Sequence, residues 1–427
     1  MKRFLLSIIV IVAVVFMAGC RNTGSSAPAP SNVKVAEGEN TVTITWDMLP
    51  GVEYWVFKAV GTNITPESCY VLPQCQIFPK AVSPTVISGL TNGTTYSFTV
   101  NGRINGGKGG PGSPSISVTP RLAGASWKVG APQGSKDLHG IAFSSIFVAT
   151  GAESTLLTST DGMAWTPQTD ITWLSMTAPA TLPDLKAVNY GGLYVTVGSG
   201  GILLSSSNAV NWTQQASNIT SDLFAVANNG NSVYVATGAN GTIINNSNGV
   251  SWLPASSIPL GTPALYGVSF GNGMYVAVGA GGTVLTSDAL GNTWIPAIAA
   301  LPLPVNDLKG IAYGPGVSPT GPGTNTTGTF VAVGANGTVV TSTDGGLSWG
   351  VPVSSNPIPS TTTINAIAYG TQFVAVGNEG SIYISFDAVN WIPGASDPPN
   401  TSAIYAVVRG ISSYFAVGAA GLNMYSK

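Results

Sequence analysis

The feature that most constrains this chain is an internal repeat that fills the sequence from residue 126 onward. Copies aligned on a shared Gly-x-x-Gly turn begin at Leu138, Leu185, Leu223, Leu265, Leu308, Ile364 and Ile404. Each copy holds three short hydrophobic runs, and a tryptophan then opens a fourth. Such runs, separated by turn residues, predict short antiparallel strands. A repeat of about 40 residues that holds four strands is typical of a propeller blade, whose sheet is buried against the neighbouring blades.

The two ends of the repeat predict how the ring closes. The last copy stops at residues 425–427, after three strands, whereas ASWKVG (residues 125–130) supplies a tryptophan-bearing strand ahead of the first copy. Pairing these two segments completes the last sheet and removes an exposed edge. We therefore predict an all-β chain in which residues 125–427 form a seven-bladed β-propeller with non-covalent ring closure.

A different strand pattern precedes the repeat. TVTITW (residues 41–46) and YWVFKAV (54–60) alternate with a period of two, and turn signals follow at the intervals of a β-sandwich. Trp46, the LTNGTTY run (90–96) and the strand at 115–119 resemble the core and tyrosine corner of a fibronectin type III domain. The resemblance implies a sandwich over residues 32–120. The small and proline-rich residues 20–31 predict a flexible tether.

The N-terminus is typical of an exported protein. Lys2 and Arg3 precede an apolar run, residues 4–16, that is short for a membrane span. Met17-Ala18-Gly19-Cys20 then resembles the lipobox of bacterial lipoproteins. The resemblance implies removal of residues 1–19, acylation of Cys20 (palmitate among the chains) and a membrane anchor in the cell envelope. The alternative is an ordinary signal peptide with an incidental cysteine.

Two further expectations follow from an exported chain. Arg21 stands where aspartate would favour retention in the inner membrane, so we expect the outer membrane, with a periplasmic or surface-facing protein. Cys69 and Cys75 lie in CYVLPQC, and oxidising conditions outside the cytoplasm predict a disulfide between them. A metal site is the weaker alternative, because His139 is the only histidine. We expect neither a metal nor a cofactor.

The turn before each tryptophan carries a recurring acidic residue. STDGGLSW (residues 342–349) fits the Ser-x-Asp-x-Gly-x-Ser/Thr-Trp pattern and resembles the Asp-box of sialidases and other BNR-like propellers. Asp161, Asp344 and Asp387 occupy the third position, where other copies carry asparagine and one carries alanine. Asparagine would abolish a general base or nucleophile, but it still accepts backbone N–H bonds. We therefore predict structural turn residues.

Residue counts argue against the chemistry of sialidases. The resemblance to that class implies three arginines, a Tyr/Glu nucleophilic pair and an acid, whereas residues 126–427 hold one arginine, Arg409, and two glutamates, Glu153 and Glu379. We therefore expect a protein without catalytic residues; a glycan-active hydrolase of the Asp-box type is the alternative. Only 7% of residues are charged and the net charge is −2, so nucleic acid is not an expected partner.

The repeat as a whole resembles another propeller family. The pattern LxxVxxG…YVAVGxxGTVLxSxDGxxW across residues 126–427 is similar to the photosystem II assembly factors. That resemblance implies a non-enzymatic propeller that binds a partner polypeptide through an arginine-rich patch, which this sequence lacks. We expect a lipid-anchored binding or scaffold protein that presents its propeller to a protein or glycan; assembly of an envelope complex is the alternative.

Two parts of the repeat are candidates for recognition. The loops between copies vary in length, and variable loops on a rigid frame commonly bind partners. The second residue of each first strand also varies strongly, although Gly or Ala always follows it. We predict that these side chains line the mouth of the central channel on the loop face; alternatively, they fill gaps between blades. They are His139, Lys186, Phe224, Tyr266, Lys309, Asn365 and Tyr405.

Overall fold

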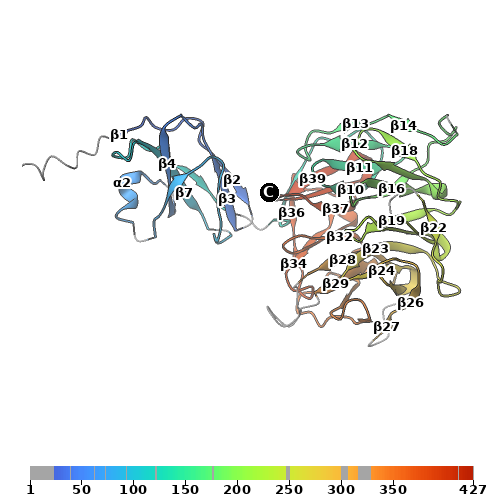
Figure 1. Cartoon of the computed structure of the whole chain (residues 1–427). Coiled ribbons are helices and arrows are strands. Elements are labelled where there is room, and N and C mark those ends of the chain that lie inside the picture. Colours follow the sequence, from blue (N-terminus) through green and yellow to red (C-terminus); the bar gives the residue numbers. More distant parts are fainter. Residues whose placement is uncertain are drawn as a thin grey trace, which may run out of the picture. The chain divides into compact units, whose positions relative to one another are not determined.

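The chain forms two compact units, Met1–Leu122 and Ala123–Lys427, in the computed structural model (Figure 1). The structure describes residues 24–426 except 39, 62, 73, 93, 121–122, 176, 247–250, 300–305, 316–327 and 412. The predicted signal segment 1–19 and Cys20 lie outside the described residues. Within the described part, no helix is both long and apolar enough to span a membrane. The boundary between units falls inside the predicted junction, between residues 120 and 125.

The first unit consists of two antiparallel sheets and a short helix, α2 (Pro66–Cys69). One sheet has the order β1-β7-β4-β5, with β8 paired to β7, and the other has the order β2-β3-β6. The strands of the first sheet are β1 (Ser25–Ser26), β4 (Val52–Val60), β5 (Gln76–Ala81), β7 (Tyr96–Ile104) and β8 (Ile116–Val118). Those of the second are β2 (Lys34–Gly38), β3 (Thr41–Thr45) and β6 (Thr85–Ile87).

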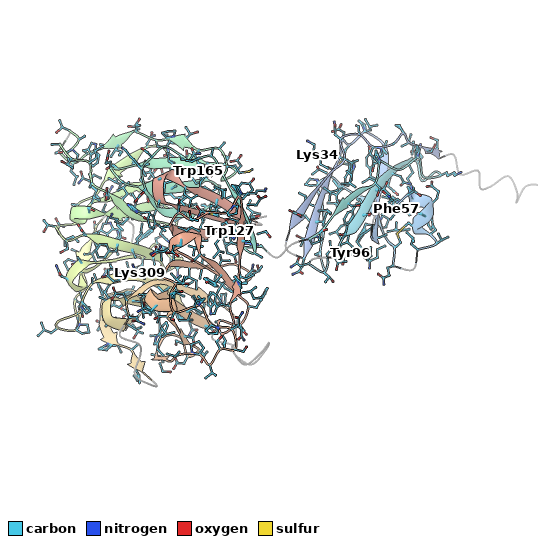
Figure 2. All side chains as sticks on the ribbon, turned by 180° about the vertical axis from the view of Figure 1, so that it is seen from behind. Lys34, Phe57, Tyr96, Trp127, Trp165 and Lys309 are labelled. Atoms are coloured by element: carbon cyan, nitrogen blue, oxygen red, sulfur yellow. A yellow bond between two sulfur atoms is a disulfide. The ribbon has the colours of Figure 1, made fainter. Side chains whose placement is uncertain are left out.

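Alternation along these strands builds the core of the first unit. Val42 and Ile44 point inward from β3 and are fully buried, while the threonines between them are half-buried. Tyr96, at the start of β7 (Figure 2), accepts a hydrogen bond at its Oη from the Thr91 N–H at 3.1 Å. This bond ties the turn before β7 to the strand, and Leu90 is buried beside it.

The prediction of a flexible tether over residues 20–31 is wrong for its described part. Ser25 and Ser26 form β1 and pair with Ile104 and Arg103 of β7. Ala27 is 2% exposed, and its N–H donates to the Gly102 carbonyl. Gly110, in the segment after β7, allows this close approach, because a Cβ there would lie 1.9 Å from the Ala27 oxygen. The small residues that suggested flexibility thus serve backbone packing.

In the second unit each copy of the repeat forms one antiparallel sheet. The first three sheets contain β10 (Leu138–Phe143), β11 (Phe147–Gly151), β12 (Leu156–Ser159) and β13 (Thr166–Pro167); β15 (Leu185–Tyr190), β16 (Tyr194–Gly198), β17 (Leu203–Ser206) and β18 (Trp212–Gln214); and β19 (Leu223–Asn228), β20 (Tyr234–Gly238), β21 (Ile243–Asn246) and β22 (Leu253–Pro254). Consecutive strands pair as neighbours in each sheet, as a meander requires.

The remaining copies follow the same plan, except that the sheet of the fifth copy has three strands and its fourth strand is joined to it only through an isolated bridge between Thr341 and Gly350. They contain β23 (Leu265–Gly271), β24 (Met274–Gly279), β25 (Val284–Ser287) and β26 (Trp294–Pro296); β28 (Leu308–Gly314), β29 (Thr329–Gly334), β30 (Val339–Ser342) and β31 (Ser348–Trp349); β32 (Ile364–Tyr369), β33 (Phe373–Gly377), β34 (Ile382–Ser385) and β35 (Ile392–Pro393); and β37 (Ile404–Arg409), β38 (Tyr414–Gly418) and β39 (Asn423–Ser426). In the last sheet the outer strand is β9 (Ser126–Val129).

A tight 3₁₀ turn joins the second and third strands in most copies. The central residue has a left-handed backbone, with φ of 64° at Gly200 and 53° at Asn240, which glycine and asparagine adopt readily. The glycine before the turn has another role: a Cβ on Gly279 would lie 2.0 Å from the Ala264 carbonyl oxygen. The turns are η1 (Ser199–Gly201), η2 (Ala239–Gly241), η3 (Ala280–Gly282), η4 (Ala335–Gly337), η5 (Asn378–Gly380) and η6 (Ala419–Gly421).

The ring closes through the first strand of the unit. β9 pairs antiparallel with β39, which places Trp127 opposite Ser426. The inner strands contact one another in the closed series β10, β15, β19, β23, β28, β32, β37 and again β10. Figure 1 shows the red strands of the last copy beside the green β10 of the first. The predicted pairing of ASWKVG with the last copy is therefore present in the structure.

Segments between the sheets add short parallel strands that the sequence pattern does not reveal. β14 (Ile171–Thr172) pairs with β18, β27 (Ile298–Ala299) with β31, and β36 (Ala395–Asp397) with β9. Each segment comes from one copy and lies along the outer strand of the next. It thereby covers part of an edge that would otherwise be open to pairing with another chain.

Candidate functional site

The Asp-box residues act as hydrogen-bond acceptors inside their own turns. Asp161 Oδ1 accepts from Ser159 Oγ at 2.9 Å and from the N–H groups of Met163 and Ala164 at 2.8 and 2.9 Å. Asn208 Oδ1 accepts the equivalent set, from Ser206 Oγ and two N–H groups at 3.1, 3.0 and 2.9 Å. Because asparagine reproduces the bonds of aspartate, the turn requires an acceptor and no ionisation.

Asp344 and Asp387 hold the same kind of turn. Burial by itself would raise the pKa of Asp344, but hydrogen bonds from Ser348, Ser342 and the Leu347 N–H outweigh burial and keep that pKa below its usual range. The pKa of Asp387 is lowered by the same balance, with donors from Asn390, Val389 and Ser385. All three predicted turn residues thus accept the hydrogen bonds that the turn interpretation requires.

We expect Asp161→Asn to change the free energy of unfolding at pH 7 by less than about 1 kcal/mol, and Asp161→Ala to cost about 1 kcal/mol, as for the loss of a cap. Backbone donors at Ala164 and Met163 lower the pKa of Asp161. Its ionised form therefore adds stability above about pH 4, and this stability is lost as the pH falls through the lower folded-state pKa. Denaturant titrations between pH 7 and pH 2.5 should show a weaker acid dependence for Asp161→Asn. Equal losses at pH 7 for both variants would contradict this role.

Each of the predicted binding residues lies at a break in strand register. The pairing between the first and second strands shifts at this position in every copy, as between Leu138 and Gly140, which pair with Gly151 and Thr150. The inserted residue is a β-bulge, a device that redirects a side chain and bends the strand. We call these residues the bulge ring: His139, Lys186, Phe224, Tyr266, Lys309, Asn365 and Tyr405.

The bulge ring is half-buried throughout, and several of its members contact across neighbouring sheets. The rings of His139 and Tyr405 lie 5.6 Å apart, and those of Phe224 and Tyr266 are also 5.6 Å apart. Asn365 Nδ2 donates to the Ile404 carbonyl at 3.0 Å. The structure thus brings four of the seven residues together as two aromatic pairs on neighbouring inner strands, an arrangement that also fills gaps between sheets.

Charges around the bulge ring are partly compensated. Lys186 Nζ lies 2.9 Å from Asp184 Oδ2. Burial, followed by the positive charge of Lys186, lowers the pKa of His139, while Asp184 and Asp137 oppose the shift. The imidazole is therefore mainly neutral at pH 7, which leaves the lysines as the cations of the ring. Lys309, labelled in Figure 2, occupies the same bulge on β28.

A second set of aspartates, absent from the sequence-based predictions, connects neighbouring sheets. Asp184 Oδ1 accepts the Glu153 N–H at 3.0 Å, and Asp222 Oδ1 accepts the Gly200 N–H at 2.7 Å. Asp137 Oδ1 accepts the Ala420 N–H at 2.9 Å and so joins the first copy to the last. The sequence feature that could have revealed these aspartates is the Asp-Leu pair at the start of four of the copies.

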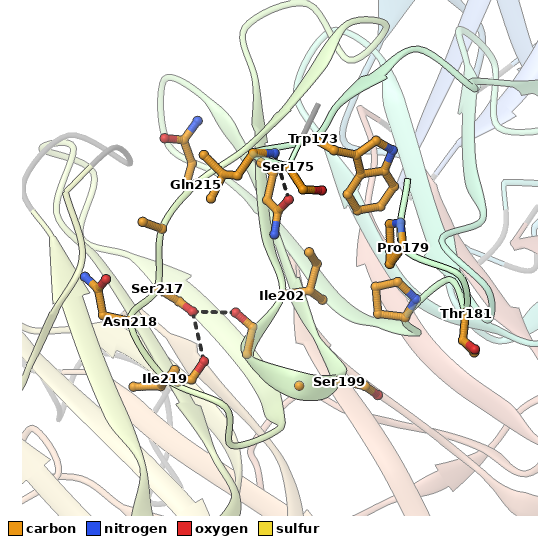
Figure 3. A pocket seen from close by; sticks show the side chains of 16 residues that line it. Trp173, Ser175, Pro179, Thr181, Ser199, Ile202, Gln215, Ser217, Asn218 and Ile219 are labelled. Atoms are coloured by element: carbon orange, nitrogen blue, oxygen red, sulfur yellow. Dashed lines mark hydrogen bonds between the residues drawn. The ribbon is translucent and has the colours of Figure 1, made fainter. Parts of the chain in front are cut away.

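The loop face also carries a cavity of about 520 Å³ in the second copy of the repeat. Three parts of the chain line it: residues 173–175 and 179–183, the turn η1, and the stretch 214–219 that begins at the end of β18. Figure 3 shows Trp173 and Pro179 on one side, with Gln215, Ser217 and Asn218 across from them. Trp173 also lines a neighbouring cavity of about 410 Å³. Sequence reasoning placed recognition on these loops but did not identify either cavity.

The predicted disulfide joins the end of α2 to the segment directly before β5. Cys69, the last residue of α2, is bonded to Cys75 with a Cα–Cα separation of 5.3 Å. Cys69 is 4% exposed and packs with Phe57, Ala59 and Ile64. Among residues placed by the structure, no group of three or more His, Cys, Asp or Glu side chains could hold a metal ion.

Comparisons with solved structures support the propeller. YCF48 bound to D1 peptide has a TM-score of 0.53 and 17% identity, covering 72% of this chain and 98% of that chain. YCF48 from Cyanidioschyzon merolae has a TM-score of 0.52 and 17% identity, covering 71% and 98%. U3-55K gives 0.52 at 9% identity, covering 70% and 98%. At these identities the likeness shows the fold alone.

The search of curated proteins gives no match. A model of one protein family, described as the DUF6242 beta propeller domain, matches residues 170–419. This match spans more than half of the chain and covers the sheets from β15 to β38. The chain therefore belongs to the DUF6242 beta-propeller family.

Proposed function

We propose that this protein is a lipid-anchored binding or scaffold protein of the cell envelope, whose propeller presents its loop face to a protein or glycan partner and catalyses no reaction. The observation that carries the proposal is the cavity beside Trp173, because it opens among variable loops on a rigid ring. A pocket on such a frame recognises a ligand with little reorganisation.

The proposed architecture has three parts. Acylated Cys20 anchors the chain, most simply in an outer membrane, and a fibronectin type III-like sandwich follows. The propeller then closes as seven blades. The Thr91–Tyr96 hydrogen bond supports the fibronectin-like assignment, since a tyrosine corner has this geometry. The closed series of inner strands supports the proposed ring.

A non-catalytic role is supported by the environment of the acidic residues. Asp161, Asp344 and Asp387 all have a lowered pKa and use their oxygens to hold turns. A general acid near pH 7 needs the opposite shift, which burial without donors would give. We therefore propose that these residues take no part in hydrolysis.

Assembly of an envelope complex is the second candidate. It is favoured by the likeness to YCF48, whose solved complex contains a D1 peptide. In this version of the proposal the loop face holds a segment of a subunit during assembly. Arg409 cannot supply the arginine-rich patch that the resemblance implies, because it contacts the Tyr414 ring at 4.8 Å within its own sheet.

Site-specific photocrosslinking in intact cells tests the binding role. A benzophenone amino acid is placed at Asn218, which is exposed beside the cavity, or at Phe386, which is 50% exposed in an Asp-box turn. We expect adducts with one defined partner from Asn218 and none from Phe386. A glycan adduct would be detected by a mass increase without a second polypeptide. Equal labelling from both positions would refute a loop-face site.

We expect Cys20→Ser to release the protein from the membrane fraction. Several acyl chains give stable attachment at about 0.8 kcal/mol per buried CH₂ group, and serine has no thiol to carry them. The measurement is fractionation after metabolic labelling with palmitate. Cys69→Ser is the matched control, because it leaves the anchor intact and should stay in the membrane fraction. Unchanged labelling of Cys20→Ser would show that this residue is not the acylated one.

A further inference from the structure

We propose that the cavity beside Trp173 binds a neutral oligosaccharide, with Trp173 as the stacking platform for a sugar ring and Gln214 as a hydrogen-bond donor. This inference rests on the proposed binding function and gives its ligand a chemical class. None of the described side chains that line the cavity is ionisable. A charged ligand would lose its hydration there without gaining an opposite charge, which is costly.

The polar groups of the cavity are amides and hydroxyls. Gln214, Gln215 and Asn218 contribute amides, while Ser175, Thr181 and Ser199 contribute hydroxyls. These groups both donate and accept hydrogen bonds, as sugar hydroxyls do. Their chemistry matches a polyhydroxylated ligand without net charge.

The local structure fixes the direction of the Gln214 amide. Its Oε1 accepts the Leu174 N–H at 3.1 Å. No described partner takes its Nε2 group, so this donor remains for a ligand. The contact also secures the backbone directly after Trp173. One hydrogen bond therefore positions both the donor and the aromatic residue.

The indole of Trp173 is held as a rigid wall. β14 ends at Thr172 and pairs in parallel with β18, so Trp173 directly follows a paired strand. Its side chain is half-buried and packs against the cluster that contains Leu185, Ile202 and Trp212. Figure 3 shows it beside Pro179 at the edge of the cavity. A rigid apolar wall suits the C–H face of a sugar ring, because it gives contact area at little cost in side-chain entropy.

The neighbouring cavity indicates a ligand longer than one sugar. Trp173 lines both cavities, of about 520 and 410 Å³. The second is lined by Gln168, Thr169 and Thr155 and also by Lys136 and Glu153, which form an ion pair at 2.8 Å and so add no net charge to the lining. A chain of several sugars can occupy both cavities and cross the loop at Trp173.

Binding is measured with the full chain in a detergent that has no sugar head group. The probes are cello-, xylo- and manno-oligosaccharides of three to six units, oligogalacturonates as charged counterparts, and a library of extended peptides. We expect at least one neutral oligosaccharide to bind, with the same affinity in 50 and 500 mM salt, because no charge pair contributes. Trp173→Ala should weaken binding at least tenfold.

Further variants distinguish the loss of a binding contact from a general loss of folded structure. Trp173→Phe keeps an aromatic wall and should bind better than Trp173→Ala. Gln214→Met removes both the donor and the bond to the Leu174 N–H at similar volume and should lose several-fold. Phe386→Ala, on an Asp-box turn outside the cavity, should leave affinity unchanged. Thermal unfolding of each variant establishes that it is folded.

Three results would overturn the inference. They are the absence of binding to every neutral oligosaccharide, sugar binding that Trp173→Ala leaves unchanged, and binding of peptides that neutral sugars do not displace. If Asn218 still crosslinks to a polypeptide in cells, the proposed binding function stands while the glycan assignment fails. If neither adducts nor sugar binding are found, both fail.

Discussion

Trp127→Ala is expected to lower the free energy of unfolding of the propeller by about 3–5 kcal/mol, the range for removing a large aromatic side chain from a core. Trp127 is 1% exposed, and its Nε1 donates to the Gly124 carbonyl at 2.6 Å. Its strand, β9, is also the outer strand of the last sheet. The substitution therefore both creates a cavity and weakens ring closure.

Trp165→Ala provides the matched control for Trp127→Ala. Trp165 occupies the equivalent place in the first copy, but it is half-buried and its Nε1 has no described hydrogen-bond partner. Both residues are labelled in Figure 2. Denaturant unfolding followed by far-ultraviolet circular dichroism should show a clearly smaller loss for Trp165→Ala. If Trp127→Ala costs no more than this control, β9 is not the closing strand of the ring.

Gly279→Ala is expected to destabilise the propeller by about 1–3 kcal/mol or more, as overpacking does. The added Cβ would lie 2.0 Å from the Ala264 carbonyl oxygen. The Gly279 N–H donates to the Thr283 carbonyl at 3.0 Å within the turn. The backbone has no room to move without breaking these contacts. The same glycine ends the second strand in every copy, for the same steric reason.

Gly350→Ala is the control for this steric argument. No atom lies within 4 Å of a Cβ built there, and the backbone is not left-handed. Its thermal unfolding midpoint should stay close to that of the unchanged protein, whereas that of Gly279→Ala should fall by several degrees. Equal midpoints for the two variants would show that the approach to Ala264 relaxes freely.

The propeller was predictable because the copies of the repeat carry turn glycines and a tryptophan at recurring positions. The Gly-x-x-Gly turn needs left-handed backbone, the buried tryptophan needs a large pocket, and the missing fourth strand of the last copy needs a partner. Together these requirements identify β9 as the strand that completes β39.

Other parts of the fold have no periodic hydrophobic pattern in the sequence that could reveal them. β14 and β27 are two residues long, too short for alternation to appear, and they pair with strands of the following copy. β1 was taken for part of a tether because serine and alanine are common in linkers. Its pairing depends on Gly102 and Gly110, which lie more than 70 residues away and could not be connected to it by local pattern.

The candidate sites, like the fold, were only partly predictable from the sequence. The bulge ring was singled out by its variability, but the bulges were not predicted, and its ring contacts depend on residues in neighbouring copies such as His139 and Tyr405. The cavity beside Trp173 was missed because three segments from different parts of the chain build it. A lone tryptophan outside the repeat pattern, in the loop after the first copy, was the one available signal.

The closing strand determines how the propeller unit responds to a pull from its N-terminal side. The chain enters the propeller unit immediately before Ser126, so any pull from the preceding residues reaches the ring first through β9. β9 is held on both sides, antiparallel to β39 and parallel to β36, and Lys128 also forms an ion pair with Asp397. Force applied from this side is therefore shared between two neighbouring strands, and rupture would remove the strand that completes the last sheet.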